Sequence, residues 1–216
     1  METIQGKKPF AITENEFFHR IVGYENVHLD LGTGDGRFTC HQARQNPQDF
    51  FIGIDACREN LRENSRNCPP NALYLIASAQ SLPHELDFLA AEITINFPWG
   101  SLLRGLLEDD PALFNGLARV ACPGAALTVR LNGGALSEAG WALDAGTWRV
   151  YENLLSNGYQ VKSPYVMEVD DLRACPTTWA KRLAFGRDPR GCLIAARASL
   201  KLQPIKEARI SESIFA

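Results

Sequence analysis

Short runs of apolar residues recur along the first 131 residues, and segments with helical periodicity separate them. A nearly continuous apolar run is typical of a parallel strand that is buried on both faces. The pattern therefore predicts a doubly wound α/β fold in which helices cover a mostly parallel sheet. The predicted strands are VHLDL (27–31), FFIGI (50–54), LYLIA (73–77), EITINF (92–97) and AALTVRL (125–131), and the helices between them are 37–45, 58–67 and 101–121.

The two ends of the chain add further predicted elements. TENE at 13–16 places Thr at a helix cap and Glu three residues later, which predicts a helix through Val22. Before that helix, residues 4–11 are expected to form a small hairpin around Gly6, so that residues 1–24 make an N-terminal extension. Beyond the fifth strand, the pattern predicts a helix at 147–157 and strands at 159–166 and 192–200.

Two stretches in the second half of the chain are expected to be irregular. The first, NGGALSEAGWALDAG at 132–146, is rich in glycine and is predicted to be a mobile loop over the site. The second, 170–191, joins the last two predicted strands. The other elements follow one another without a composition break, so we expect a single domain over residues 1–216.

The composition favours a soluble intracellular protein. A chain of 216 residues with 45% hydrophobic residues is long enough to bury a core of its own. No apolar run could span a bilayer, and the opening METIQGKKPF lacks the apolar core of a signal peptide. The six cysteines are scattered and contain no CxxC pair, so we expect reduced thiols in the cytoplasm and no metal site.

Charge is divided unevenly along the chain. Residues 1–179 carry 14 Lys and Arg against 22 Asp and Glu, a balance of −8, whereas residues 180–216 carry 8 against 3, a balance of +5. Trp179 stands directly before the basic segment, in TTWAKRLAFGRDPRG. A local basic region on an acidic protein indicates either a solvated tail or a specific anionic partner such as nucleic acid.

A glycine-rich loop follows the first predicted parallel strand. In DLGTGDGR (30–37), the third glycine of a dinucleotide fingerprint would fall at position 37, which is Arg. A GxGxG spacing with Asp30 before Gly32 and Gly34 is instead the pattern of methyltransferases that use S-adenosylmethionine (SAM). Asp55 ends the second of these strands, where a carboxylate can bind both ribose hydroxyls of a cofactor.

A second candidate motif follows the fourth predicted parallel strand. Residues just beyond strand ends line the ligand crevice of an open α/β sheet, and NFPWG (96–100) begins there. Trp99 is therefore a candidate platform on which a flat substrate could stack, although a lone tryptophan at such a position more often has a packing role.

Three segments together resemble the Kam/Npm family of aminoglycoside-resistance methyltransferases, which methylate N1 of adenine 1408 in 16S rRNA. They are VHLDLGTGDGR (27–37), FPWGSLLRG (97–105) and WAKRLAFGR (179–187), and FIGIDACRENL (51–61) and AQSLPHEL (79–86) extend the match. The resemblance implies a Rossmann-like SAM fold with a seven-stranded sheet, an N-terminal hairpin, and two linkers at 132–146 and 170–191 that frame the active site.

The resemblance also implies roles for individual residues. Trp99 and Trp179 match the two tryptophans that flank the flipped adenine. Further positions match contacts to SAM, namely Gly32, Asp55, Ala79, Gln80, Asn96, Ser101 and Thr177. Basic residues near the second tryptophan match those that bind the rRNA backbone, namely Lys181, Arg182 and Arg187.

Three features depart from the family pattern. The chain has Gln80 where members carry Glu, and Asn96 where they carry an aliphatic residue. NFPW thereby approaches the [DNS]PP[YFW] pattern of amino-group methyltransferases, which keeps N6 of adenine open as the target atom. RENSRNCPPN (62–71) replaces a longer lysine-rich loop, so we expect arginines on the preceding helix to bind RNA instead, namely Arg58, Arg62 and Arg66.

The implied reaction fits the residues of the motifs. N1 of adenine holds a free lone pair and no proton, so methyl transfer from SAM needs placement of the two atoms but no general base. The expected partner is the 30S subunit, which a monomer would recognise by its shape. Two alternatives stay open: a SAM-dependent enzyme for another RNA adenine or a small molecule, and an RNA-binding factor without activity.

Overall fold

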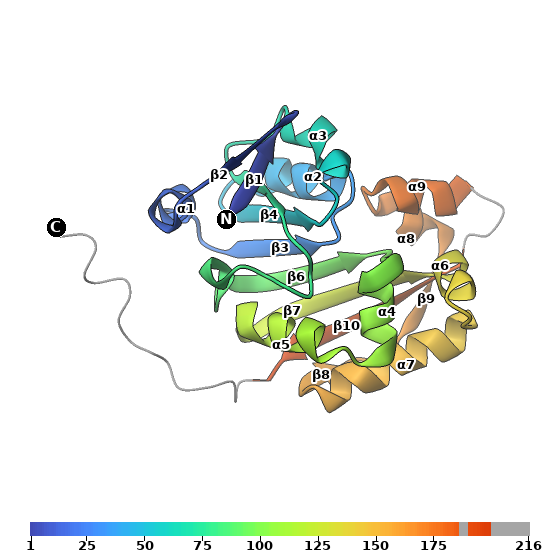
Figure 1. Cartoon of the computed structure of the whole chain (residues 1–216). Coiled ribbons are helices and arrows are strands. Elements are labelled where there is room, and N and C mark those ends of the chain that lie inside the picture. Colours follow the sequence, from blue (N-terminus) through green and yellow to red (C-terminus); the bar gives the residue numbers. More distant parts are fainter. Residues whose placement is uncertain (186–189, 200–216) are drawn as a thin grey trace.

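The computed structural model describes residues 1–185 and 190–199. Its strands form one sheet in the order β2-β1-β5-β4-β3-β6-β7-β10-β8, and β9 pairs with β10 beside β8 (Figure 1). The strands are β1 Glu2–Gln5, β2 Lys8–Ala11, β3 Val27–Leu31, β4 Phe50–Asp55, β5 Ala72–Ile76, β6 Ala90–Asn96, β7 Ala121–Asn132, β8 Tyr159–Val161, β9 Tyr165–Met167 and β10 Gly191–Ala198.

The centre of the sheet, from β5 to β7, is parallel, and antiparallel pairs close both sides. The prediction of an α/β fold with a mostly parallel sheet is therefore confirmed. Helices α2 and α3 pack against β4 and β5, and α7 packs against β10 and α4. The helices are α1 Glu14–Ile21, α2 Arg37–Gln45, α3 Arg58–Ser65, α4 Gly100–Glu108, α5 Pro111–Val120, α6 Gly133–Glu138, α7 Leu143–Ser156, α8 Val169–Ala174 and α9 Thr178–Phe185, with a short 3₁₀ turn at His84–Leu86.

The main core lies between this sheet and its helices. The central strands contribute side chains with almost no exposed surface, such as Leu31, Ile52 and Ile95. Burial on both faces explains why these strands read as continuous apolar runs. No helix in the described part of the chain is both long and apolar enough to cross a membrane.

The expected seven strands are ten in the described residues, because the predicted strand at 159–166 is two strands and the N-terminal hairpin adds β1 and β2 to the sheet. Lys162 still donates its N–H to the carbonyl of Ala195 at 2.8 Å. Pro164 has no N–H to donate, so the chain leaves the ladder and returns as β9. Together, β8 and β9 occupy one edge of β10.

The expected helix at 101–121 is also two elements. Asp109 adopts φ 59°, which ends α4, and the side chain of Asp110 caps α5 by accepting the N–H of Ala112. Pro111 occupies the first turn of α5, where its missing N–H costs nothing.

Both stretches expected to be irregular contain helices. The 132–146 stretch forms α6 and the start of α7, because the Asn132 side chain accepts the N–H of Ala135 at 2.7 Å and caps α6. Burial of Ala135 and Leu136 offsets the low helix propensity of the glycines before them. In the 170–191 stretch, α8 and α9 are the helices that the prediction missed.

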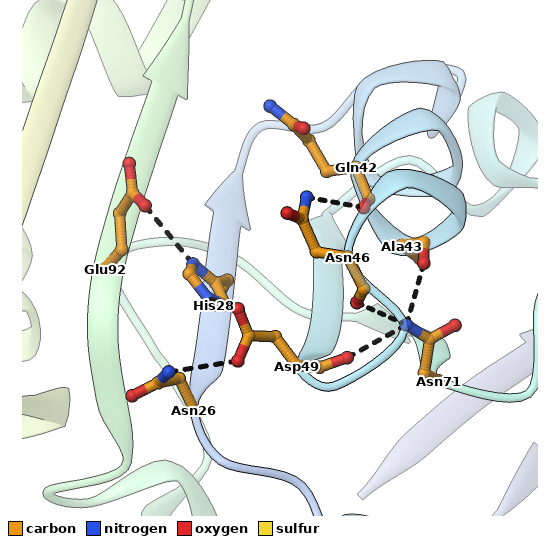
Figure 2. Close-up of polar contacts among 8 residues, drawn as sticks. All are labelled: Asn26, His28, Gln42, Ala43, Asn46, Asp49, Asn71 and Glu92. Atoms are coloured by element: carbon orange, nitrogen blue, oxygen red, sulfur yellow. Dashed lines mark hydrogen bonds and ion pairs between the residues drawn. The ribbon is translucent and has the colours of Figure 1, made fainter.

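A polar cluster fixes the beginnings of the central strands (Figure 2). His28 of β3 lies between two carboxylates: its Nε2 is 3.1 Å from Asp49 and its Nδ1 is 3.3 Å from Glu92. Burial would lower the pKa of His28, but the hydrogen bonds and charges of Glu92 and Asp49 outweigh burial and raise it. A protonated ring has an N–H for each carboxylate, so this arrangement favours the imidazolium ion.

Replacement of His28 by Gln should destabilise the protein more at acidic than at alkaline pH. A raised native pKa means that the stabilisation is complete below the unfolded pKa of about 6.5 and is lost as the pH rises through the native value. We expect about 1 kcal/mol or less, because the pair is partly solvated. Urea unfolding of both proteins from about pH 5 to pH 9 measures the difference in their free energies of unfolding. A difference that stays constant or increases with pH would contradict the prediction.

Candidate functional site

The glycine loop leaves β3 and enters α2 with three glycines in the left-handed region. Gly32, Gly34 and Gly36 have φ of +68°, +59° and +74°. A Cβ at Gly32 would lie 2.6 Å from Leu102, and one at Gly36 would lie 2.4 Å from the ring of Tyr74. No atom of the described residues lies within 4 Å of a Cβ placed on Gly34. The loop is therefore packed from below and open at its tip, where a ligand can approach the backbone.

Asp55 connects the end of β4 to this loop. Its Oδ2 accepts the N–H of Gly34 at 2.8 Å, and its Oδ1 accepts the N–H of Cys57 at 2.8 Å. Asn60 also donates to Oδ1 at 3.3 Å, and a carboxylate has more acceptor positions than these three bonds use, so the ribose can still bind there. The structure thus brings together Asp55 and Gly34, two of the residues predicted to bind the cofactor.

The other predicted cofactor residues lie at the ends of the neighbouring strands. Gln80 follows β5, accepts a hydrogen bond from Ser78, and donates from Nε2 to the carbonyl of Ser101 at 3.1 Å. Ala79 beside it is buried. The end of β5 and the first turn of α4 are therefore joined at the position where the carboxyl ends of parallel strands form a crevice.

Asp30 is enclosed beneath the loop. Its carboxylate accepts hydrogen bonds from Thr39, Thr94 and Asn96 at 2.9 to 3.1 Å, and from Thr33 in the loop. Burial raises the pKa of Asp30, and these four donors act in the opposite direction. A carboxylate surrounded in this way holds the loop and β6 together from within.

Asn96 lies between two charged side chains, one of which the sequence analysis missed. Its Nδ2 donates to Asp30 at 2.9 Å, and its Oδ1 accepts from the Arg130 guanidinium at 2.7 Å. Because a guanidinium can only donate, this contact fixes which end of the amide is the oxygen. The sequence signal was a lone arginine in the apolar run AALTVRL, in register with Asn96 on the adjacent strand.

The two candidate tryptophans contact each other although they are far apart in the sequence. Trp99 directly precedes α4, Trp179 lies in the first turn of α9, and their ring centroids are 5.1 Å apart at an interplanar angle of 31°. The guanidinium carbon of Arg182 lies 5.0 Å from the centroid of Trp179. Within the described residues, Nε1 of Trp99 is buried and has no hydrogen-bond partner.

A small separate core brings these tryptophans together. Phe97 is fully buried with φ 52°, a left-handed conformation that is strained for a residue with a side chain. Its ring packs in a cluster with residues of β9, α8 and α9, namely Met167, Leu172, Cys175 and Ala180. The strained turn thereby anchors the Trp99 loop to the segment that carries Trp179.

Helix α9 is also tied to the glycine loop. Thr177 caps the helix by accepting the N–H of Ala180 at 2.8 Å, and Thr178 donates from Oγ1 to Asp35 at 2.6 Å. Asp35 and Thr178 are further positions that the sequence analysis did not single out. Their bond places the helix that carries Trp179 directly against the predicted cofactor loop.

The predicted RNA-binding cations lie on two helices. Lys181 and Arg182 are exposed on α9, and Arg66 is exposed at the end of α3. Arg62 of α3 is half-buried and paired with Glu59 at 2.9 Å. Arg187 lies outside the described residues. Across the described ranges, no group of three or more His, Cys, Asp or Glu side chains could hold a metal ion.

Asn96→Leu should lower the free energy of unfolding by about 1 to 3 kcal/mol, because Asp30 and Arg130 would both lose a buried partner. Arg130→Val in the same chain should recover part of that loss, since no unpaired guanidinium then remains. Urea unfolding of the two single variants and the double variant measures their coupling, which we expect to be about 0.5 to 3 kcal/mol. Strictly additive losses would show that the two side chains act independently.

Known proteins match this chain over most of its length. The family model described as NpmA, 16S rRNA (adenine(1408)-N(1))-methyltransferase, matches residues 2–198. A protein of Streptoalloteichus hindustanus named 16S rRNA (adenine(1408)-N(1))-methyltransferase is 33% identical over 204 residues, which are 87% of this chain and 94% of that protein.

Solved structures agree with the sequence matches. The crystal structure of the 16S rRNA methyltransferase KamB is 30% identical, superimposes with a TM-score of 0.83, and covers 92% of this chain and 100% of its own. The aminoglycoside resistance methyltransferase NpmB1 is also 30% identical, with a TM-score of 0.75 and the same coverage. The chain therefore belongs to the family of 16S rRNA (adenine(1408)-N(1))-methyltransferases.

Proposed function

We propose that this protein transfers a methyl group from SAM to N1 of adenine 1408 of 16S rRNA in the 30S subunit. The Trp99–Trp179 pair beside the glycine loop is the observation that carries the proposal, because it combines a platform for a flat base with a cofactor crevice. A methyl group on the pairing edge of that base would give resistance to aminoglycosides that bind there. We further infer that the protein works in the cytoplasm, where ribosomes are, and that it acts as a monomer.

The residues of the crevice fit SAM. The open side of Gly34 lets the backbone approach a ligand, and Asp55 at the end of β4 offers acceptors for ribose hydroxyls. Gln80 can bond the adenine end, and Thr177 caps α9, whose first residue Thr178 donates to Asp35 in the glycine loop. When bound, SAM supplies an electrophilic methyl group on a sulfonium.

The two tryptophans would hold the target base after it leaves its stack. Extrusion costs a few kcal/mol, and stacking on an aromatic side chain contributes about 1 to 3 kcal/mol per contact. A base between two rings needs centroids about 7 Å apart, twice the roughly 3.4 Å spacing of stacked bases. The observed 5.1 Å is shorter, so the rings must separate to admit the base.

The contacts of Asn96 support N1 rather than N6 as the target atom. An amino-group methyltransferase of the [DNS]PP[YFW] type needs a side-chain oxygen that accepts a hydrogen bond from the target amine. The oxygen of Asn96 accepts from Arg130 at 2.7 Å and its nitrogen donates to Asp30, and because the residue is buried a target amine has little access to the second lone pair of that oxygen. N1 has a lone pair and no proton, so it requires in-line placement but no acceptor of this kind.

The purified protein with SAM should methylate isolated 30S subunits and produce a reverse-transcription stop at adenine 1408. Naked 16S rRNA should give little product, because the contacts that bind phosphates read shape and not sequence. A stop at another adenine would show that the protein is an rRNA methyltransferase with a different target base. Methyl incorporation without any stop would indicate N6, and no incorporation into RNA would refute the proposal.

Trp179→Ala should lower kcat/KM for 30S methylation by roughly 10- to 100-fold, the equivalent of one lost stacking contact. Trp179→Phe should retain part of the activity because a phenyl ring still stacks. Trp148→Ala is the matched control, since Trp148 is an exposed tryptophan on α7 that packs on Tyr151. Equal losses in the Trp179→Ala and Trp148→Ala variants would remove the role assigned to Trp179.

A further inference from the structure

The turn between β1 and β2 presents two lysines to solvent. Gln5 pairs with Lys8 in the antiparallel hairpin, so Gly6 and Lys7 form a two-residue turn. Lys7 and Lys8 are both exposed, and neither forms an ion pair with any described residue. Their charges are therefore available to a partner.

This turn is held against α3. The N–H of Gly6 donates to Oγ of Ser65 at 3.0 Å, and Ile4 packs with Leu61 in a small core. Gly6 has φ +61°, and a Cβ there would lie 3.9 Å from the side chain of Arg66. The tip of the hairpin is thus fixed beside the last turn of α3, where Arg66 is exposed.

Helix α3 is joined in turn to α9 through the glycine loop. Asn64 of α3 donates from Nδ2 to the carbonyl of Asp35 at 2.6 Å, and Thr178 of α9 donates to the Asp35 carboxylate at 2.6 Å. In Figure 1, the hairpin turn lies beside α3 at the top, and α9 lies to its right. The basic residues of all three elements therefore belong to one connected framework that borders the tryptophan pair.

Lys7 and Lys8 contribute most of the net positive charge of the surface formed by the hairpin turn and α3. Helix α3 and its cap at Arg66 carry three arginines and two glutamates, a balance of +1, and Glu59 contacts both Arg58 and Arg62. Addition of the two lysines raises the balance to +3 and supplies charges without acidic partners among the described residues. Arginines on α3 alone would give phosphates only a weak attraction.

We propose that Lys7 and Lys8, together with Arg66, bind phosphate groups of the rRNA backbone. The inference rests on the proposed function and adds a second site of contact with the RNA backbone, besides that of Lys181 and Arg182 on α9. Two separated backbone contacts fix the orientation of the RNA over the crevice, although neither reads its sequence. The hairpin thereby replaces cations that the short segment after α3 lacks.

The test measures binding of the full-length protein to 30S subunits and the KM for these subunits, from about 50 to 300 mM salt. The double variant Lys7→Gln/Lys8→Gln should bind roughly tenfold more weakly, with a salt slope smaller by about 2. Lys7→Arg/Lys8→Arg should bind like the wild type because both charges remain. Lys162→Gln is the matched control: an exposed lysine beside β8, on the other edge of the sheet.

The outcomes separate this inference from the proposed function. Wild-type protein that methylates 30S subunits, with a double variant equal to it in KM and salt slope, would overturn the role of the hairpin alone. An equal loss in Lys162→Gln would also overturn it, because overall charge would then explain the effect. Wild-type protein without activity on 30S subunits would overturn both proposals. Calorimetry with SAM on each variant confirms that the crevice is folded.

Discussion

The arrangement of the site depends on Asp35, a residue in the middle of the glycine loop. Its carbonyl accepts from Asn64, 29 residues further along the chain, and its carboxylate accepts from Thr178, 143 residues further along. Both bonds require a loop whose path is set by left-handed glycines and whose underside is packed by Leu102 and Tyr74. The loop that would bind the cofactor therefore also positions α3 and α9. The proposed contacts to the cofactor, to the target base and to the RNA backbone would consequently depend on the same loop.

A buried polar network supports that frame from below. A carboxylate removed from water is costly unless donors surround it, and Asp30 has four of them: two from β6, one from α2 and one from the loop between β3 and α2. Asn96 extends the network to Arg130 on β7, so three neighbouring strands end in one hydrogen-bonded layer. The strained Phe97 follows directly on β6 and begins the turn to Trp99. The strained turn is thus held between this hydrogen-bonded layer and the small core around Phe97.

The sequence predicted the elements in which local signals and tertiary packing agree. The strand at 27–31 and the helix at 37–45 have the predicted bounds, because an apolar run and a glycine loop mark both. The prediction of a loop at 132–146 is wrong: glycines favour a loop, but Asn132 supplies a helix cap and Leu136 a buried side chain. The break at Asp109 was present in the sequence as DDP, but apolar periodicity on both sides concealed it.

The glycine loop, Asp55 and NFPWG could be located from the sequence because they follow the ends of parallel strands, which a sheet gathers at one edge, whereas Trp179 lies on a helix that follows no such strand. The side-chain contacts between different motifs could not be located from the sequence. Asn96–Arg130 and Asp35–Thr178 join residues 34 and 143 positions apart, and no local pattern relates them. Nor could the sequence show that Trp99 and Trp179 touch.

That contact raises the question of which ring moves to admit a base. The ring of Trp99 packs on the main core, and the backbone at Trp179 is pinned by the Thr178–Asp35 bond and by buried Ala180. The side chain of Trp179 is 38% exposed and covered by Arg182. Rotation of that side chain therefore disturbs less packing than any shift of Trp99 or of the helix. A phosphate that attracts Arg182 would remove the cation from the face of Trp179, so the proposed binding of the RNA backbone would favour the proposed opening of the pair.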